Sequence, residues 1–304
     1  MLLHSIVKKV SKPILGTVGP WLAPVRHAKQ GLAIFVFHEV TENPSPHSRQ
    51  CSTHCNESLF RRQLKWIRDR FLVIHPLQLD QGTIPPGSAL LTFDDGYKSF
   101  RTVALPILED MDLPSIVFLN MDVVEGSPNA YAAIAWHRRG SHQALGSPSD
   151  SLPETYERVV RPLRGLDELA EFRKFQGDYL GEGDLLALDG HPLVAFGSHL
   201  SNHWHGPSLR DSQFDEAILT NQHRLDRYRN GMRWLAYPFG VGTHNLDERA
   251  RGHGVRRMFT GQGRLNPDAT QEVLDRIDLS AEIRNQFLFR WRLSSRTVLH
   301  GLRG

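Results

Sequence analysis

Six short apolar runs divide this chain at intervals that suit buried β-strands. They are AIFVFH (33–38), ALLTFD (89–94), SIVFLN (115–120), LVAFGS (193–198), RWLAYP (233–238) and RRMFTG (256–261). Such runs, with helical stretches between them, predict parallel strands that are covered on both faces. The stretches 58–70 and 212–228 place apolar residues on one side and predict two amphipathic helices. Strands of this kind close most economically into a barrel, whose reactive groups lie at the carboxyl ends of the strands.

The predicted barrel occupies residues 31–290. Residues 122–192 do not follow this alternation of strands and helices: they contain Trp136, the run His137-Arg138-Arg139, a Ser/Pro-rich stretch and a charged helical stretch. We interpret them as an insertion over the mouth of the barrel. Residues 1–30 form a separate amphipathic segment and residues 291–304 a basic tail.

Composition places the chain among ordinary globular enzymes. Of its 304 residues, 40% are hydrophobic and 23% charged, which provides for one large core. The net charge of +3 comes from 36 basic and 33 acidic side chains that are spread along the chain. This distribution does not indicate a nucleic-acid partner.

The first twelve residues, MLLHSIVKKVSK, separate into an apolar and a basic helical face. Such a helix either packs on its own domain or lies on a membrane surface. The lysines interrupt the apolar stretch, so it lacks the order of a secretory signal, and no apolar run is long enough to cross a bilayer. We therefore expect a cytoplasmic protein, with peripheral contact to the inner face of the membrane through residues 1–12 as one interpretation.

The two cysteines, Cys51 and Cys55, lie near His47 and His54 in a polar segment. Two cysteines cannot form a disulfide framework. The segment is either a small zinc site or a loop that carries two free thiols.

Two adjacent carboxylates, Asp94 and Asp95, follow a predicted strand and precede Gly96. Neighbours in a regular strand point to opposite faces, so both can serve one site only where the strand breaks. Gly96 permits such a break. The alternative is that Asp-Asp-Gly is simply a turn.

A second candidate group follows another predicted strand. His199 and His203 are four residues apart, a spacing that places two imidazoles on one face of a helical turn, and His205 competes for the same role. Two imidazoles and one carboxylate would leave open coordination positions on a metal ion, as a hydrolytic site requires.

Two weaker signals complete the pattern. Arg233 begins a strand that runs into Pro238, Phe239 and Gly240, and His38 ends the first predicted strand. Taken singly, the arginine is a charged strand start and the histidine a structural residue.

In this order, TFDDG, H-x-x-x-H and R-x-x-x-x-P-x-G resemble the motifs of the polysaccharide deacetylase family with the NodB homology domain, carbohydrate esterase family 4. The resemblance covers roughly residues 30–280. It implies a distorted (β/α)7 barrel that uses a divalent metal, commonly zinc, to remove acetyl groups from N-acetylated sugars.

The resemblance also implies a role for each matching residue. Asp95, His199 and His203 would bind the metal, and Asp94 would be the general base. Arg233 would orient that base, and the backbone N–H of Phe239 would help to bind the oxyanion.

This chain departs from the family pattern at two places. Leu200 follows His199 where the family usually has Ser or Thr, so a supporting hydroxyl is missing or comes from Ser201. The late Leu-x-His motif has no clear match, because VLH at 298–300 lies at the extreme C-terminus. Circularly permuted relatives, similar to poly-N-acetylglucosamine deacetylases, carry this histidine on an N-terminal strand, so we assign the general acid to His38 rather than His300, with Asp278 as its orienting carboxylate.

We therefore expect a metal-dependent N-deacetylase that acts on an N-acetylated glycan or its lipid-linked precursor. Two alternatives stay open: a related amidase or deformylase that acts on another amide, and a glycan-binding protein without catalysis.

Overall fold

The computed structural model describes residues 31–139, 147–160 and 166–279. The amphipathic segment 1–30, the tail 291–304 and His300 lie outside these residues.

Six parallel strands lie side by side in the order β1, β5, β6, β7, β8 and β9. Each corresponds to one of the six apolar runs, which confirms those predictions. Their bounds are Leu32–Phe37 (β1), Ser88–Phe93 (β5), Ser115–Leu119 (β6), Val194–Ser198 (β7), Gly231–Ala236 (β8) and Arg257–Thr260 (β9).

A seventh segment closes the sheet. Its first half, β10 (Val273–Asp275), pairs with β9, and its second half, β11 (Ile277–Asp278), pairs with β1. Only Arg276 lies between the two halves. Residues 273–278 therefore join the two ends of the sheet, and the predicted distorted (β/α)7 barrel is confirmed. A short strand, β4 (Leu72–Val73), pairs with the first residues of β5.

Alternation along the strands divides the core into two layers. In β1 and β5, Leu32, Ile34 and Leu90 belong to one buried apolar cluster, together with Phe118 and Trp234. The residues between them, including Phe35, Leu91 and Phe93, belong to a second cluster that also contains apolar residues of the surrounding helices. Successive side chains of a strand point to opposite faces, so strands buried on both sides must be apolar throughout.

The helices that follow the strands cover the outside of the barrel. The predicted helices at 58–70 and 212–228 are confirmed as α3 (Glu57–Arg68) and α11 (Asp211–Leu225). Outside the β6–β7 connection, the described residues also form the helices α2 (Pro46–Cys51), α4 (Pro76–Asp80), η1 (Phe100–Ala104), α5 (Leu105–Asp110), η4 (Gly206–Ser208), η5 (Pro238–Gly240) and α12 (His244–Gly252). Two short strands, β2 (Glu39–Val40) and β3 (His54–Cys55), pair beside α2.

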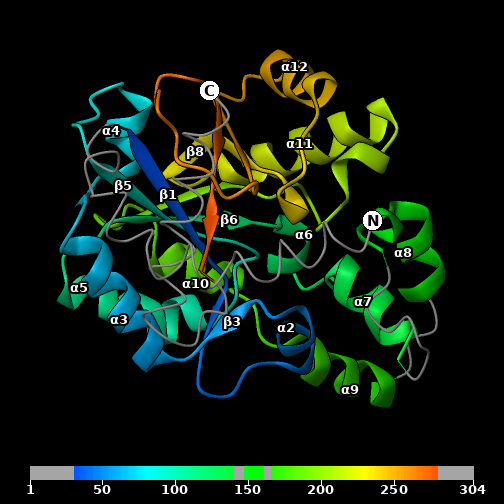
Figure 1. The fold of residues 1–304 in the computed structure, drawn as a ribbon. Coiled ribbons are helices and arrows are strands. Elements are labelled where there is room, and N and C mark those ends of the chain that lie inside the picture. Colours follow the sequence, from blue (N-terminus) through cyan, green and yellow to red (C-terminus); the bar gives the residue numbers. More distant parts are fainter. Residues whose placement is uncertain (1–30, 140–146, 161–165, 280–304) are drawn as a thin grey trace, which may run out of the picture.

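The connection between β6 and β7 is long and mostly helical. It contains α6 (Met121–Val124), α7 (Ala130–His137), η2 (Pro148–Asp150), α8 (Pro153–Val160), α9 (Leu166–Gln176) and α10 (Glu182–Ala187). Ile134 and Trp136 of α7 pack with Val159 of α8 and Phe172 of α9 in a separate small apolar cluster. Figure 1 shows α7, α8 and α9 together on one side of the molecule, away from α3 and α5, with α9 next to α2. No helix in the described part of the chain has the length and apolar character to span a membrane.

Candidate active site

Both aspartates of the Asp-Asp-Gly sequence lie at one site because the chain turns sharply at the second. The backbone N–H of Asp94 still bonds to the carbonyl of Phe37 on β1, as in a continuing strand. Asp95 and Gly96 then adopt left-handed φ angles of 68° and 75°. Asp tolerates this region better than most residues, although Gly96 adopts it at less cost. The predicted break in the strand is therefore present, and it starts at Asp95.

The two histidines lie on the loop after β7. His199 is buried, and its Nδ1 donates a hydrogen bond to the carbonyl of Ala236 at the end of β8 (2.7 Å). This bond places the proton on Nδ1 and leaves the lone pair of Nε2 for a ligand. Leu200 has a φ of 60°, which is strained for a bulky residue, and its buried side chain anchors the turn in an apolar cluster.

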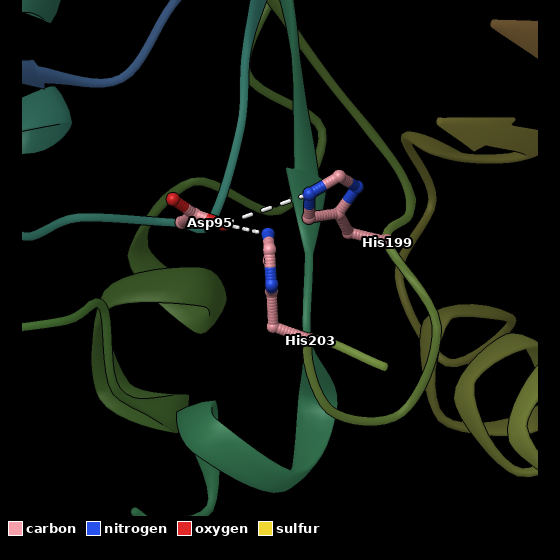
Figure 2. Close-up of side chains that lie close together, drawn as sticks. All are labelled: Asp95, His199 and His203. Carbon is pink, nitrogen blue, oxygen red and sulfur yellow. Dashed lines mark ion pairs between the residues drawn. The ribbon is translucent and has the colours of Figure 1, made fainter. Parts of the chain in front are cut away.

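Asp95, His199 and His203 converge on one point. The Nε2 atoms of the two histidines lie 3.5 Å and 3.4 Å from Asp95 Oδ1. Figure 2 shows the carboxylate of Asp95 directed toward both rings. The three ligand atoms lie within 4.8 Å of one another.

This geometry suits a metal ion. Donors about 2.1 Å from a tetrahedral ion lie about 3.4 Å apart, which matches both distances to Asp95 Oδ1. That oxygen is buried and has no hydrogen-bond partner among the described residues. Burial lowers the pKa of His199 and of His203 to about 4, so both imidazoles are neutral at neutral pH, the form that binds metals.

We expect His199→Ala to lower the affinity for zinc by more than about 100-fold, because loss of a ligand exceeds the effect of an outer-shell change. The measurement is zinc content by mass spectrometry after reconstitution and dialysis. His205→Ala is the matched control: its ring bonds to Ser208 Oγ and does not line the cavity, so this variant should keep its zinc. Equal zinc loss in both variants would contradict the assignment.

The counter-ion of Asp94 is Arg276. Its Nη1 and Nη2 donate to Asp94 Oδ1 (2.6 Å) and Oδ2 (2.8 Å), and both side chains are almost fully buried. A bidentate pair of this kind fixes the plane of the carboxylate. Each oxygen keeps a further lone pair that can accept a proton.

Arg233 does not orient Asp94, which corrects the sequence-based assignment. It lies near the amino end of β8, with its side chain exposed, and pairs with Asp226 (2.7 Å). The site gathers at the carboxyl ends of the strands, so this position cannot reach it.

The two adjacent aspartates differ in acidity. Burial alone would raise the pKa of Asp94, but the ion pair with Arg276 and the nearby His199 hold it well below its usual range. Burial raises the pKa of Asp95, and the carboxylate of Asp94 adds to this effect. The ion pair with Arg276 therefore keeps Asp94 ionised, whereas a cation beside Asp95 would lower the pKa that burial raises.

His38 directly follows β1, one residue beyond the paired Phe37 and Phe93, and so lies beside Asp94, which directly follows β5. Its ring lines the same cavity as Asp94 and Asp95. Its Nδ1 is buried without a hydrogen-bond partner in the described structure. Asp278 pairs in register with Val36 on the other side of β1 and also lines the cavity.

Phe239 forms part of the cavity wall. Its φ of 60° turns the short helix η5 so that its ring contacts that of His203 edge-on, with the centroids 4.5 Å apart. Gly240 and Gly261 lie beside it, where a Cβ on Gly240 would be 2.7 Å from the backbone of Gly261. The cavity has a volume of ≈ 340 Å³, near the lower end of small-molecule sites.

Amide side chains hold the histidine loop in place, which the sequence did not indicate. Asn120 Nδ2 donates to the carbonyls of His199 and Leu200. Asn221 Nδ2 donates to Leu119 O and Ser198 Oγ, while its Oδ1 accepts from Met121 N–H. Ser201 Oγ accepts from the indole of Trp204, so Ser201 does support the loop.

Asn221→Ala should lower the free energy of unfolding by about 1–3 kcal/mol for each buried group that loses its partner. Chemical denaturation measures this change. Asn245→Ala, at an exposed position of α12, is the control and should stay within about 0.5 kcal/mol of wild type. Similar free energies of unfolding for both variants would show that the contacts of Asn221 do not contribute to stability.

The cysteines do not form a zinc site in the structure. The described residues contain one cluster of three potential ligands with metal-binding spacing, and neither cysteine belongs to it. Cys55 is buried in the core. Cys51 lines the cavity with its Sγ 3.5 Å from His47 Nε2, and burial, together with Asp95, raises the pKa of this thiol to about 12.

Comparison with solved structures places this barrel among the polysaccharide deacetylase folds. Aligned over 88% of this chain and 96% of the other, it is similar to IcaB from Ammonifex degensii (TM-score 0.58, 19% identity). It is also similar to the Streptococcus pyogenes deacetylase PplD, solved with acetate (TM-score 0.54, 16% identity, 86% and 98% covered). A third similar structure is the de-N-acetylase from Aggregatibacter actinomycetemcomitans (TM-score 0.57, 13% identity, 86% and 99% covered). No protein-family model and no curated protein sequence matches the chain.

Proposed function

We propose that this protein is a metal-dependent N-deacetylase that hydrolyses the acetamide of an N-acetylated glycan. The observation that carries the proposal is that the two adjacent aspartates have different partners. Asp94 is held by Arg276, whereas Asp95 faces His199 and His203. The likeness of the fold to a deacetylase solved with acetate and to a de-N-acetylase supports the same reaction.

Amide hydrolysis needs a nucleophile at neutral pH and a partner for the charge that develops on the carbonyl oxygen. A divalent ion held by Asp95, His199 and His203 would supply Lewis acidity, which makes water more acidic and polarises the carbonyl. The donor set of two imidazoles and one carboxylate suits zinc, and we propose zinc as the native ion.

Asp94 acts as the general base in this proposal. Its carboxylate takes the proton of the attacking water on a lone pair that Arg276 leaves free. Its low pKa keeps it ionised at neutral pH but makes it a weak base, so the acidity of the water must provide part of the driving force.

Two further groups complete the reaction in this proposal. The backbone N–H of Phe239 stabilises the oxyanion from the cavity wall. His38, as imidazolium, gives a proton to the leaving amine, and Asp278 on the neighbouring strand orients it. The products are acetate and a free amino sugar.

The test is acetate release from soluble N-acetylglucosamine oligomers by zinc-loaded protein, with formate release from N-formylated substrates measured in parallel. Acetate release supports the proposal. Formate without acetate would favour a deformylase, and binding of the oligomers without either product would favour a glycan-binding protein.

The natural substrate that we propose is a lipid-linked precursor of a polysaccharide, processed in the cytoplasm. This part rests on the amphipathic pattern of residues 1–12. Acetate release from vesicle-bound and from soluble substrate, compared at equal concentration, tests it. A preference for the soluble form would contradict it.

A further inference from the structure

The wall of the cavity opposite the strand ends comes from the β6–β7 connection and from α2. Asn129 and Tyr131, at the start of α7, line this wall together with His47 of α2. The described barrel strands contribute none of these three residues. The reaction proposed above does not use them.

Tyr131 is the central residue of this wall. Its ring contacts Phe239 edge-on, with centroids 4.8 Å apart, and faces His203 at 6.1 Å with an interplanar angle of 28°. It also contacts the ring of His47 edge-on, with centroids 5.7 Å apart. Tyr131 therefore adjoins both a metal ligand and the residue that we assign to the oxyanion.

The hydroxyl of Tyr131 has no hydrogen-bond partner among the described residues, and the side chain is only partly buried. The hydroxyl of Tyr237, by contrast, donates a hydrogen bond to Asp247 (2.6 Å). A tyrosine at the edge of a polar cavity, with an apolar face and an unused hydroxyl, suits a ligand that has both C–H faces and hydroxyl groups.

We propose that Tyr131 binds the N-acetylated sugar ring of the substrate. The ring of Tyr131 lies against one face of the sugar, and its hydroxyl bonds to a sugar hydroxyl. The acetamide is thereby directed toward His203 and Phe239. This inference rests on the proposed function for the class of substrate, and it assigns substrate recognition to the β6–β7 connection rather than to the barrel. The cavity volume of ≈ 340 Å³ suits one sugar residue at the reacting position.

Calorimetric binding of a soluble N-acetylglucosamine tetramer tests this contact without turnover. The parent protein is zinc-loaded Asp94→Asn, which keeps the proposed metal ligands. Adding Tyr131→Ala should weaken binding by about tenfold or more, and adding Tyr131→Phe should weaken it by less, because only the hydroxyl is lost. Zinc content and melting temperature, measured on each variant, confirm that the site is intact.

Tyr156→Phe is the matched control. Tyr156 lies on α8 and packs edge-on against Trp204, with the centroids 5.5 Å apart, outside the cavity lining. This variant should bind the tetramer like the parent. In the wild-type background, Tyr131→Phe should raise KM more than it lowers kcat.

The outcomes separate this inference from the proposed function. Tetramer binding that depends on Tyr131, together with zinc-loaded wild-type protein that releases no acetate, would support the inference and reject the deacetylase. Acetate release with tetramer binding unchanged in Tyr131→Ala would reject the inference and keep the deacetylase. A parent that does not bind the tetramer would also overturn the inference.

Discussion

Asp94→Asn is expected to lower kcat for acetate release by about 10²–10⁴-fold while the protein keeps its zinc. The amide cannot accept the proton of the attacking water, which removes general-base catalysis. Metal binding should survive because the cluster of potential ligands consists of Asp95, His199 and His203, while both oxygens of Asp94 are held by Arg276. Steady-state kinetics and metal analysis on the same preparation measure both properties.

Asp95→Asn is the matched comparison for this variant. The neighbouring residue undergoes the same chemical change, but here zinc should be lost together with activity, since an amide oxygen is a weaker ligand than a carboxylate. An Asp94→Asn protein that lost its zinc, yet became active when zinc was added, would show that the roles of the pair are reversed.

Arg276→Met should destabilise the protein by about 3–5 kcal/mol at neutral pH, because it leaves the buried carboxylate of Asp94 without its partner. Urea denaturation measures the change. Arg233→Met is the control: both partners of its ion pair with Asp226 are about half exposed, so this loss should cost no more than about 1 kcal/mol. The double variant Arg276→Met/Asp94→Asn should recover much of the lost stability, since no charge is then left uncompensated.

Arg276→Met should also change the pH dependence of activity. Arg276 lowers the pKa of Asp94, so its removal raises that pKa, and the inactive protonated form then persists to higher pH. The acidic limb of the kcat/KM profile should therefore move to higher pH in Arg276→Met and stay in place in Arg233→Met. An unshifted limb in Arg276→Met, together with wild-type stability, would mean that Arg276 does not govern the base.

Much of the fold could be predicted because each of the six strands β1, β5, β6, β7, β8 and β9 contains a short run of mostly apolar residues. The closing segment could not. Val273, Leu274 and Ile277 are interrupted by Asp275 and Arg276, a pattern that a sequence alone does not distinguish from a loop. The strand forms there because β9 and β1 provide pairing partners on its two sides, and that is a property of the assembled barrel.

The residues of the candidate site also divide into those that the sequence predicts and those that it does not. Asp94, Asp95 and His199 come directly after apolar strands, so their position at one end of a barrel could be inferred. Arg276 could not be recognised because its ion pair with Asp94 joins residues 182 positions apart. Arg233 has the spacing to Pro238 that the motif requires. In the structure, however, Arg233 lies on the outer face of β8 and near its amino end, whereas the site lies at the carboxyl ends of the strands.

The segment 273–278 also links closure of the barrel to the charge of the cavity. Arg276 is the residue at which this segment passes from β9 to β1. If β1 to β9 formed without this segment, the sheet would keep an open seam and the buried carboxylate of Asp94 would lack its ion pair. One short segment, far from β1 and β5 in the sequence, thus supplies both the pairing that closes the ring and the charge that compensates Asp94.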